Sequence, residues 1–290
     1  MVLWLDRREK LHQHTKFITA QLSTTTVPTS LYDILPGVTF ERTMKMTVHP
    51  TRKSVQFSKL ITDYGARHFC AALACYIISV RAPHLTLNQH LEESAKLYIP
   101  CVQVPIWHKV KWTTPDMYGS TSSTMVIIDS VHVTPACTNK RGHVVPSRFD
   151  TVLVYMGKED VGPAFGVKGY RVGRVRVIFT LCQQQLDQLF QPDEQEYVPK
   201  HLAYVEWFTK FSSQPEWVHG LYKVACSVDP TSGYQDASVV PVALFCRSIH
   251  LYPRFGPVVP PEWTSSTVLN LAPHFYVNAF SDRHAYYTIY

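Results

Sequence analysis

The sequence lacks a long apolar run and a dense pattern of charge. The longest apolar run, from Phe69 to Val80, is too short to span a bilayer. The charged residues between Asp6 and Lys10 leave no room for the apolar region of a signal peptide, so we expect neither a signal peptide nor a membrane partner. Charged residues make up 17% and hydrophobic residues 46% of the 290-residue chain, which excludes a disordered protein and suffices for a real core.

A disulfide framework is also missing. The seven cysteines are odd in number, no two are spaced C-x-x-C, and most lie in apolar segments. Reduced cysteines of this kind behave as small hydrophobic residues and indicate an intracellular compartment. Cys70 and Cys75 have the wrong spacing for a zinc knuckle. We therefore expect no metal and no small-molecule cofactor.

Catalytic motifs are missing as well. The chain contains no phosphate loop, no dinucleotide fingerprint, no H-E-x-x-H and no G-x-S-x-G. A two-metal nuclease needs several carboxylates on neighbouring strands, and only Asp129 and Asp150 lie in strand-like contexts. We predict that the chain is not an enzyme and does not cut or join DNA in Mg²⁺ or Mn²⁺. A remnant of a metal-dependent strand-transfer enzyme remains the alternative.

The hydrophobic period changes near residue 100. Phe69, Leu73, Ile77 and Val80 recur at helical spacing and predict a helix over 63–80, and a second helix is expected over 88–98 with Asn88 as its cap. Beyond Pro100 the period is two, which indicates many short strands. The predicted fold is α+β: a mostly helical segment at 1–98, then a mostly antiparallel barrel- or sandwich-like domain at 101–290.

Specific segments carry this prediction. Strands are expected over 101–112, 125–133, 148–156, 170–181, 202–208, 221–228, 238–245, 247–252 and 275–280. A further helix is expected over 6–21, and a short helical turn over 186–190. The predicted core includes Phe69, Leu73, Ile77, Val175, Val177, Phe179, Val205 and Trp207.

Positive charge is concentrated in the first two thirds of the chain. The net charge is +5 over residues 1–100, +5 over 101–181 and −4 over 182–290. Around Arg174 and Arg176, strand alternation predicts both guanidinium groups on one solvent face and Val175 and Val177 on the other. The candidate nucleic-acid-binding residues are Lys109, Lys111, Lys140, Arg141, Arg171, Arg174 and Arg176.

Two alternatives compete with a phosphate-binding face. The first is a solvated strand whose charges protect a sheet edge from pairing with another chain. The other is that Arg174 and Arg176 are buried and paired with an acid such as Glu206. That outcome would make both arginines structural and would favour a protein partner over DNA.

Several phrases along the chain resemble one family. They keep the family's order and spacing over most of residues 10–290: Val104 to Lys111 (VPIWHKVK), Asp129 to Val133 (DSVHV), Val145 to Val154 (VPSRFDTVLV), Gly169 to Phe179 (GYRVGRVRVIF), His201 to Phe208 (HLAYVEWF), Arg247 to Gly256 (RSIHLYPRFG) and Phe275 to His284 (FYVNAFSDRH). The sequence resembles the carboxy-terminal region of proteins encoded by Plavaka-type DNA transposable elements of basidiomycete fungi.

The resemblance implies a transposon-derived protein whose zinc-finger and transposase-like parts lie upstream of this region. It implies a non-catalytic accessory region, in the nucleus, that contacts DNA backbone or a chromatin protein. The β-rich pattern is loosely similar to bromo-adjacent-homology modules, which is an analogy of fold alone. A decayed fragment without function is the remaining alternative.

Overall fold

A computed structural model describes residues 43–115, 126–157, 167, 169–230, 233–281, 285 and 289. The helix expected over 6–21 lies outside the described residues. The described chain divides into two units: residues 43–44, 112–115 and 126–128 belong to one, and all others to the second. The second unit contains every residue of the site discussed below.

Among the described residues before 100, the chain forms the helices α3 (Phe57–Thr62), α4 (Phe69–Arg81) and α5 (Leu87–Lys96). Helix α4 buries Phe69, Leu73 and Ile77 completely, as the helical spacing predicts. The cap expected at Asn88 is wrong, because Thr86 occupies the N-cap of α5 and its backbone N–H donates to Gln89 Oε1 at 2.9 Å.

The largest sheet has the order β13-β11-β10-β3-β2, with β9 bonded to β10 and to β14. Its strands are β2 (Arg52–Gln56), β3 (Gln103–Trp107), β9 (Thr151–Tyr155), β10 (Tyr170–Phe179), β11 (Leu202–Trp207), β13 (Ala237–Pro241) and β14 (Phe245–Ser248). The described strands of this sheet pair antiparallel. Strands β13 and β2 lie at its two ends, so the described strands do not form the closed barrel that was one of the expectations.

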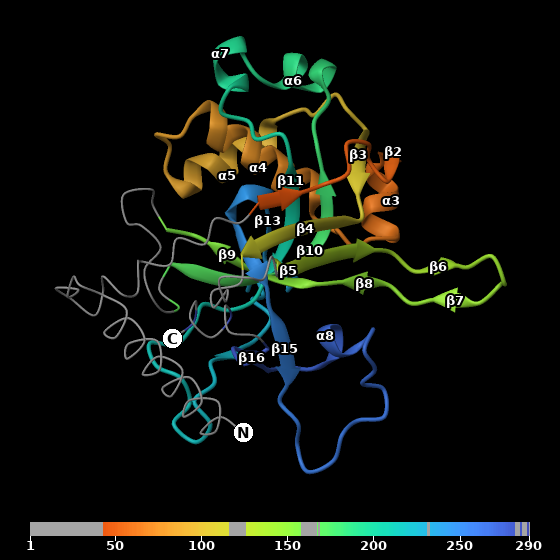
Figure 1. The fold of residues 1–290 in the computed structure, drawn as a ribbon. Coiled ribbons are helices and arrows are strands. Elements are labelled where there is room, and N and C mark those ends of the chain that lie inside the picture. The colour runs from red at the N-terminus through yellow and green to blue at the C-terminus, as the bar shows by residue number, and fades with distance from the viewer. Residues whose placement is uncertain are drawn as a thin grey trace, which may run out of the picture. The chain divides into compact units, whose positions relative to one another are not determined.

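Three smaller sheets complete the β structure of the described residues. One has the order β1-β4-β5-β8 and contains β1 (Thr43–Lys45), β4 (Lys109–Pro115), β5 (Val126–Thr134) and β8 (Arg148–Phe149). A second joins β12 (Lys223–Val224), β16 (Phe275–Asn278) and β15 (His250–Pro253). The third is the hairpin of β6 (Cys137–Thr138) and β7 (Val144–Val145), which projects from the ends of β5 and β8 (Figure 1).

Helices after residue 100 are short. Those whose bounds lie within the described residues are α6 (Gln183–Leu189), α7 (Pro192–Gln195), α8 (Val268–Leu271) and the 3₁₀ turn η1 (Val242–Leu244). The prediction of an α+β chain with few helices and mostly antiparallel sheets is confirmed for the described residues. Two expected strands are each split: His108 separates β3 from β4, and Asp150 separates β8 from β9.

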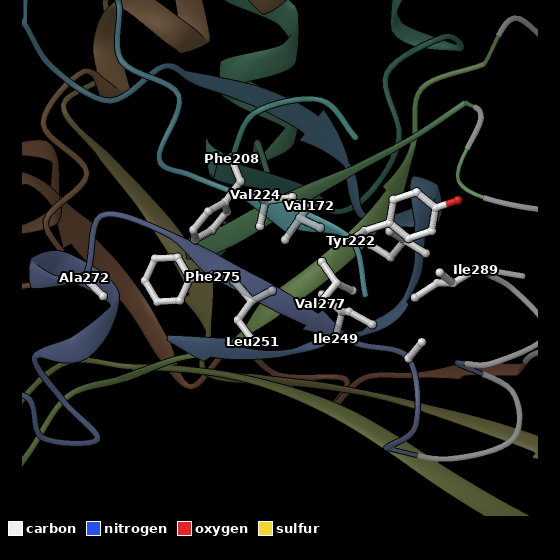
Figure 2. Packing of buried hydrophobic residues seen from close by; sticks show 12 residues of the cluster. Val172, Phe208, Tyr222, Val224, Ile249, Leu251, Ala272, Phe275, Val277 and Ile289 are labelled. Atoms are coloured by element: carbon white, nitrogen blue, oxygen red, sulfur yellow. The ribbon is translucent and has the colours of Figure 1, made fainter. Parts of the chain in front are cut away.

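Both faces of β10 are covered. Phe179 packs edge-on against Phe69 of α4, with ring centroids 5.1 Å apart. Val172 belongs to a second apolar cluster, formed largely by β12, β15, β16 and their neighbours, in which Phe208 meets Phe275 (Figure 2). The predicted core is confirmed, because all eight of its residues are buried.

Candidate partner-binding surface

Arg174 and Arg176 do not face solvent, so their predicted exposure is wrong. Arg174 is only 4% exposed, and its guanidinium donates to Asn270 Oδ1 of α8. Arg176 Nε–H donates to Glu206 Oε2 at 2.6 Å, and both side chains of this pair are largely buried. Their guanidinium groups also lie 5.8 and 5.0 Å from the centre of the Phe149 ring.

The physical reason for this error is the central position of β10. In a strand covered on both sides, residues on either side of the chain are buried, so alternation does not tell which side meets water. A register shift between Val175 and Val177 opposite β11 adds a bulge at Arg176. Arg174 and Arg176, whose pattern predicted a solvated strand face, are therefore buried, and Arg176 forms an ion pair with Glu206.

Arg171 is also held by its own chain. Its Nε–H donates to the carbonyl of Phe208 at 2.8 Å, its guanidinium lies 5.1 Å from the centre of the Trp207 ring, and Asp236 is 3.8 Å away. Burial lowers its pKa from the usual value, and Asp236 opposes this effect. Arg171 is therefore structural in the same sense as Arg174 and Arg176.

Two of the exposed candidates lie on the β6–β7 hairpin. Lys140 and Arg141 occupy its turn, which is closed by a hydrogen bond from Asn139 N–H to the His143 carbonyl at 2.9 Å and one from Gly142 N–H to the Asn139 carbonyl at 3.0 Å. Gly142 has φ +78°. The last residue of a three-residue hairpin loop usually adopts this left-handed conformation, which glycine tolerates.

The Asn139 side chain fixes the turn further. Its Oδ1 accepts hydrogen bonds from the backbone N–H groups of Arg141 and His143, at 2.9 and 3.0 Å. On the following strand, Val144 is 76% exposed. The hairpin therefore presents two cations beside an apolar side chain on a turn whose backbone is well constrained.

Lys109 and Lys111, the other two exposed candidates, lie on β4. Both are exposed, and they flank the buried Val110. On the neighbouring β5, His132 lies between the buried Val131 and Val133. Since buried side chains share one side of a sheet, the two lysines and His132 point to the opposite, exposed side.

An ordered acid lies on the same side. Asp150 Oδ2 accepts from His132 at both its backbone N–H and its Nδ1, at 2.8 and 2.9 Å, and Arg148 donates two further hydrogen bonds to the carboxylate. Because a carboxylate only accepts, Nδ1 of His132 carries the proton. We call Lys109, Lys111, Lys140, Arg141, Val144 and Arg148 the hairpin surface.

Asp129, the other acid in a strand-like context, binds a different part of the chain. Asp129 accepts from the backbone N–H of Ser248 at 2.9 Å and from its hydroxyl. Within the described parts of the chain, no three His, Cys, Asp or Glu side chains gather as metal ligands would. Asp129 and Asp150 thus each bind groups of the protein itself.

Glu206 pairs with Arg176, as the alternative with buried arginines expected, and its signal was a lone acid inside the apolar run Tyr204 to Phe208. Sequence reasoning missed other residues that organise these sites. Arg148 and Asp150 pair across two positions, a spacing that places both side chains on one side of an extended segment. Phe149, which contacts both buried arginines, carried no signal of its own.

The fold and this surface define a class: an α+β protein of antiparallel sheets that presents a basic hairpin. The chain belongs to the family described as "Domain of unknown function (DUF6830)", whose model matches residues 17–227. That range includes the hairpin surface and the buried arginines of β10. No curated protein and no solved structure matches the chain. Among the described residues, no helix is both long and apolar enough to cross a membrane.

Proposed function

We propose that this chain is a non-catalytic accessory region of a fungal transposon-encoded protein, and that it acts in the nucleus by binding an acidic surface of a chromatin protein. The ordered phrases that resemble Plavaka-type elements support the origin of the chain. The exposed hairpin with Lys140 and Arg141 beside Val144 is the single observation that carries the binding role.

The mixed chemistry of the hairpin surface favours a protein partner. With Arg171, Arg174 and Arg176 engaged internally, the longest row of candidate phosphate contacts is lost. Lys140 and Arg141 share the hairpin with the exposed Val144, and an apolar contact flanked by charges is typical of protein interfaces. DNA backbone offers no partner for such an apolar side chain.

DNA remains the second candidate, because five exposed Lys and Arg side chains share the hairpin surface. Backbone binding would show a steep salt dependence, in which log K falls by about 0.9 per contacted phosphate for each decade of salt. The strand-transfer alternative needs Asp129 and Asp150 free to hold metal, whereas both accept hydrogen bonds from the protein. We accordingly propose no enzymatic activity.

One experiment separates the two candidates. The full chain is titrated against reconstituted nucleosome core particles and against naked DNA of the same length. The proposal predicts tighter binding to the nucleosome, and loss of that preference when Lys140 and Arg141 are both changed to Glu. Equal affinity for nucleosome and naked DNA would select the DNA candidate, and no binding to either would contradict both.

A further inference from the structure

The small sheet formed by β12, β16 and β15 buries one of its faces. On that face Val224, Phe275, Leu251 and Val277 belong to the apolar cluster shown in Figure 2. Since successive side chains of a strand point to opposite sides of a sheet, the residues between these four form an outer face. This outer face contains no residue of the hairpin surface.

Aromatic side chains lie next to one another on the outer face. Tyr252 of β15 is directly opposite Tyr276 of β16, and Lys223 of β12 is opposite Tyr276 on the other side. Directly opposite residues share a face, with Cβ atoms about 5 Å apart. Tyr252 is 43% exposed, and the exposed His250 has its ring centroid 5.6 Å from that of Tyr252. The three strands therefore present a row of rings beside a cation.

Both tyrosine rings are held in place through their hydroxyl groups. The side-chain N–H of Asn278 donates to the Tyr252 hydroxyl oxygen at 2.8 Å, and the Tyr276 hydroxyl donates to Glu216 Oε2 at 3.0 Å. The His219 ring packs edge-on against Tyr276, with ring centroids 4.5 Å apart. Side chains that are already ordered lose little conformational entropy on binding, so these rings are prepared to bind a ligand.

A closed turn adds a third aromatic side chain at the border of this face. The turn over residues 216–220 is closed by a hydrogen bond from the Gly220 N–H to the Glu216 carbonyl at 2.7 Å. Within it, Trp217 is 93% exposed. Because its neighbour Glu216 bonds Tyr276, the turn is anchored to the outer face.

The outer face also carries unpaired positive charge. Arg254 is exposed and follows Tyr252 by two positions, and its N–H continues the strand pairing by bonding the His274 carbonyl at 2.9 Å. Within the described part of the chain, no ion pair involves Lys223 or Arg254. The carboxylate of Glu216 already accepts a tyrosine hydroxyl and pairs with a histidine. We call Lys223, His250, Tyr252, Arg254 and Tyr276 the tyrosine face.

We propose that the tyrosine face binds single-stranded nucleic acid, with bases stacked on Tyr252 and Tyr276 and backbone phosphates bound by Lys223 and Arg254. Every base has a π-face, so stacking on aromatic rings tolerates any sequence. The two unpaired cations fit a polyanion, whereas an apolar or neutral ligand would leave them without partners. Bases in a duplex are stacked on one another and cannot reach the rings. Single strands of DNA and of RNA share this chemistry.

Fluorescence anisotropy tests the proposal. Labelled oligothymidine and oligouridine of about 12 nucleotides, and a DNA duplex of the same length, are titrated with the full chain. The double variant Lys140→Glu and Arg141→Glu is titrated in parallel, so that the hairpin surface does not contribute. We expect this variant to bind single strands more tightly than the duplex, and the two oligomers distinguish DNA from RNA. Equal affinity for single strands and duplex in this variant, or no binding of either oligomer, would overturn the proposal.

Variants of the tyrosine face locate the binding. Tyr252→Ala removes one ring and should weaken binding of the single strands about fivefold or more, the loss expected for one stacked base. Tyr252→Phe keeps the ring and should keep most of the affinity. Lys53→Ala, at an exposed position on β2, should leave the affinity unchanged.

Arg254→Ala gives a second readout that does not depend on Tyr252→Ala being folded, because it changes an exposed side chain. It should weaken binding and lower the slope of log K against log salt by about 0.7, the value for one phosphate contact on a single strand. An unchanged affinity and slope in Arg254→Ala, or full affinity in folded Tyr252→Ala, would overturn the proposal. The nucleosome preference proposed for the hairpin surface is unaffected by either result.

Discussion

At Arg176 the free energy of unfolding depends on a buried ion pair. Changing Arg176 to Met leaves the Glu206 carboxylate buried without its 2.6 Å partner. Breaking such a pair costs about 3–5 kcal/mol. Urea unfolding should show a loss of that size, whereas Lys109→Met on the exposed surface should change the free energy by no more than about 0.5 kcal/mol. A small loss for Arg176→Met would mean that the pair is solvated.

His108 should make the fold sensitive to acid. His108 Nε2 is hydrogen-bonded to the Tyr64 hydroxyl at 2.8 Å. Burial, and then the nearby Arg52, lower the pKa of His108 from its ordinary value of 6.5. Below about pH 6.5 the unfolded chain takes up a proton that the folded chain resists, so stability falls as the pH falls.

Replacing His108 with Gln should remove this contribution. The free energy of unfolding, measured with urea at pH 7.5 and pH 5, should fall less on acidification than in the natural chain. One such group contributes at most about 1.4 kcal/mol per pH unit. His250→Gln, at an exposed position, serves as the control. An unchanged difference between the two pH values in His108→Gln would show that His108 is not the group responsible.

At the scale of the element, β10 depends on a glycine for close packing. A Cβ on Gly173 would lie 2.2 Å from Val205 Cγ1 and 3.2 Å from the Trp207 ring. Gly173→Ala should therefore destabilise the chain by about 1–3 kcal/mol. If the clash with Val205 causes the loss, the double variant Gly173→Ala and Val205→Ala should recover part of it. Chemical denaturation of the single and double variants measures the free energies of unfolding. A purely additive double variant would contradict it.

Gly142 in the hairpin turn should behave differently. An added Cβ would meet nothing within 4 Å, so the cost of Gly142→Ala comes from its φ of +78° and amounts to about 1–2 kcal/mol locally. We expect faster hydrogen exchange at the Asn139 amide, which bonds the His143 carbonyl, and unchanged exchange in β10. Unchanged exchange at Asn139 would show that the turn does not need the glycine.

Sequence reasoning succeeded where one physical signal dominates an element. The helical spacing of Phe69, Leu73 and Ile77 predicted the buried side of α4. It failed at β10, where apolar neighbours bury both sides, because alternation alone did not choose between a solvated face and the alternative in which the arginines are buried with Glu206. The candidates Lys140 and Arg141 are exposed because they lie on a turn, whereas burial of Arg174 depends on α8, almost a hundred residues away in sequence.

At the scale of the whole molecule, the predicted boundary between residues 98 and 101 remains a prediction. Strand β2 comes before it and β3 after it, and the two pair in the same sheet. A chain ending at residue 98 would leave β2 without its partner. The binding experiments are therefore designed for the full chain.

The central claim is that the hairpin surface binds an acidic chromatin protein. Its most direct test compares two variants of equal net charge by titration against nucleosome core particles. One carries Glu at Lys109, Lys111, Lys140 and Arg141, and the other carries Glu at four exposed lysines outside the hairpin surface: Lys53, Lys59, Lys200 and Lys210. The account predicts at least a tenfold loss of affinity in the first variant and near-natural affinity in the second. Equal affinities of the two variants would contradict it.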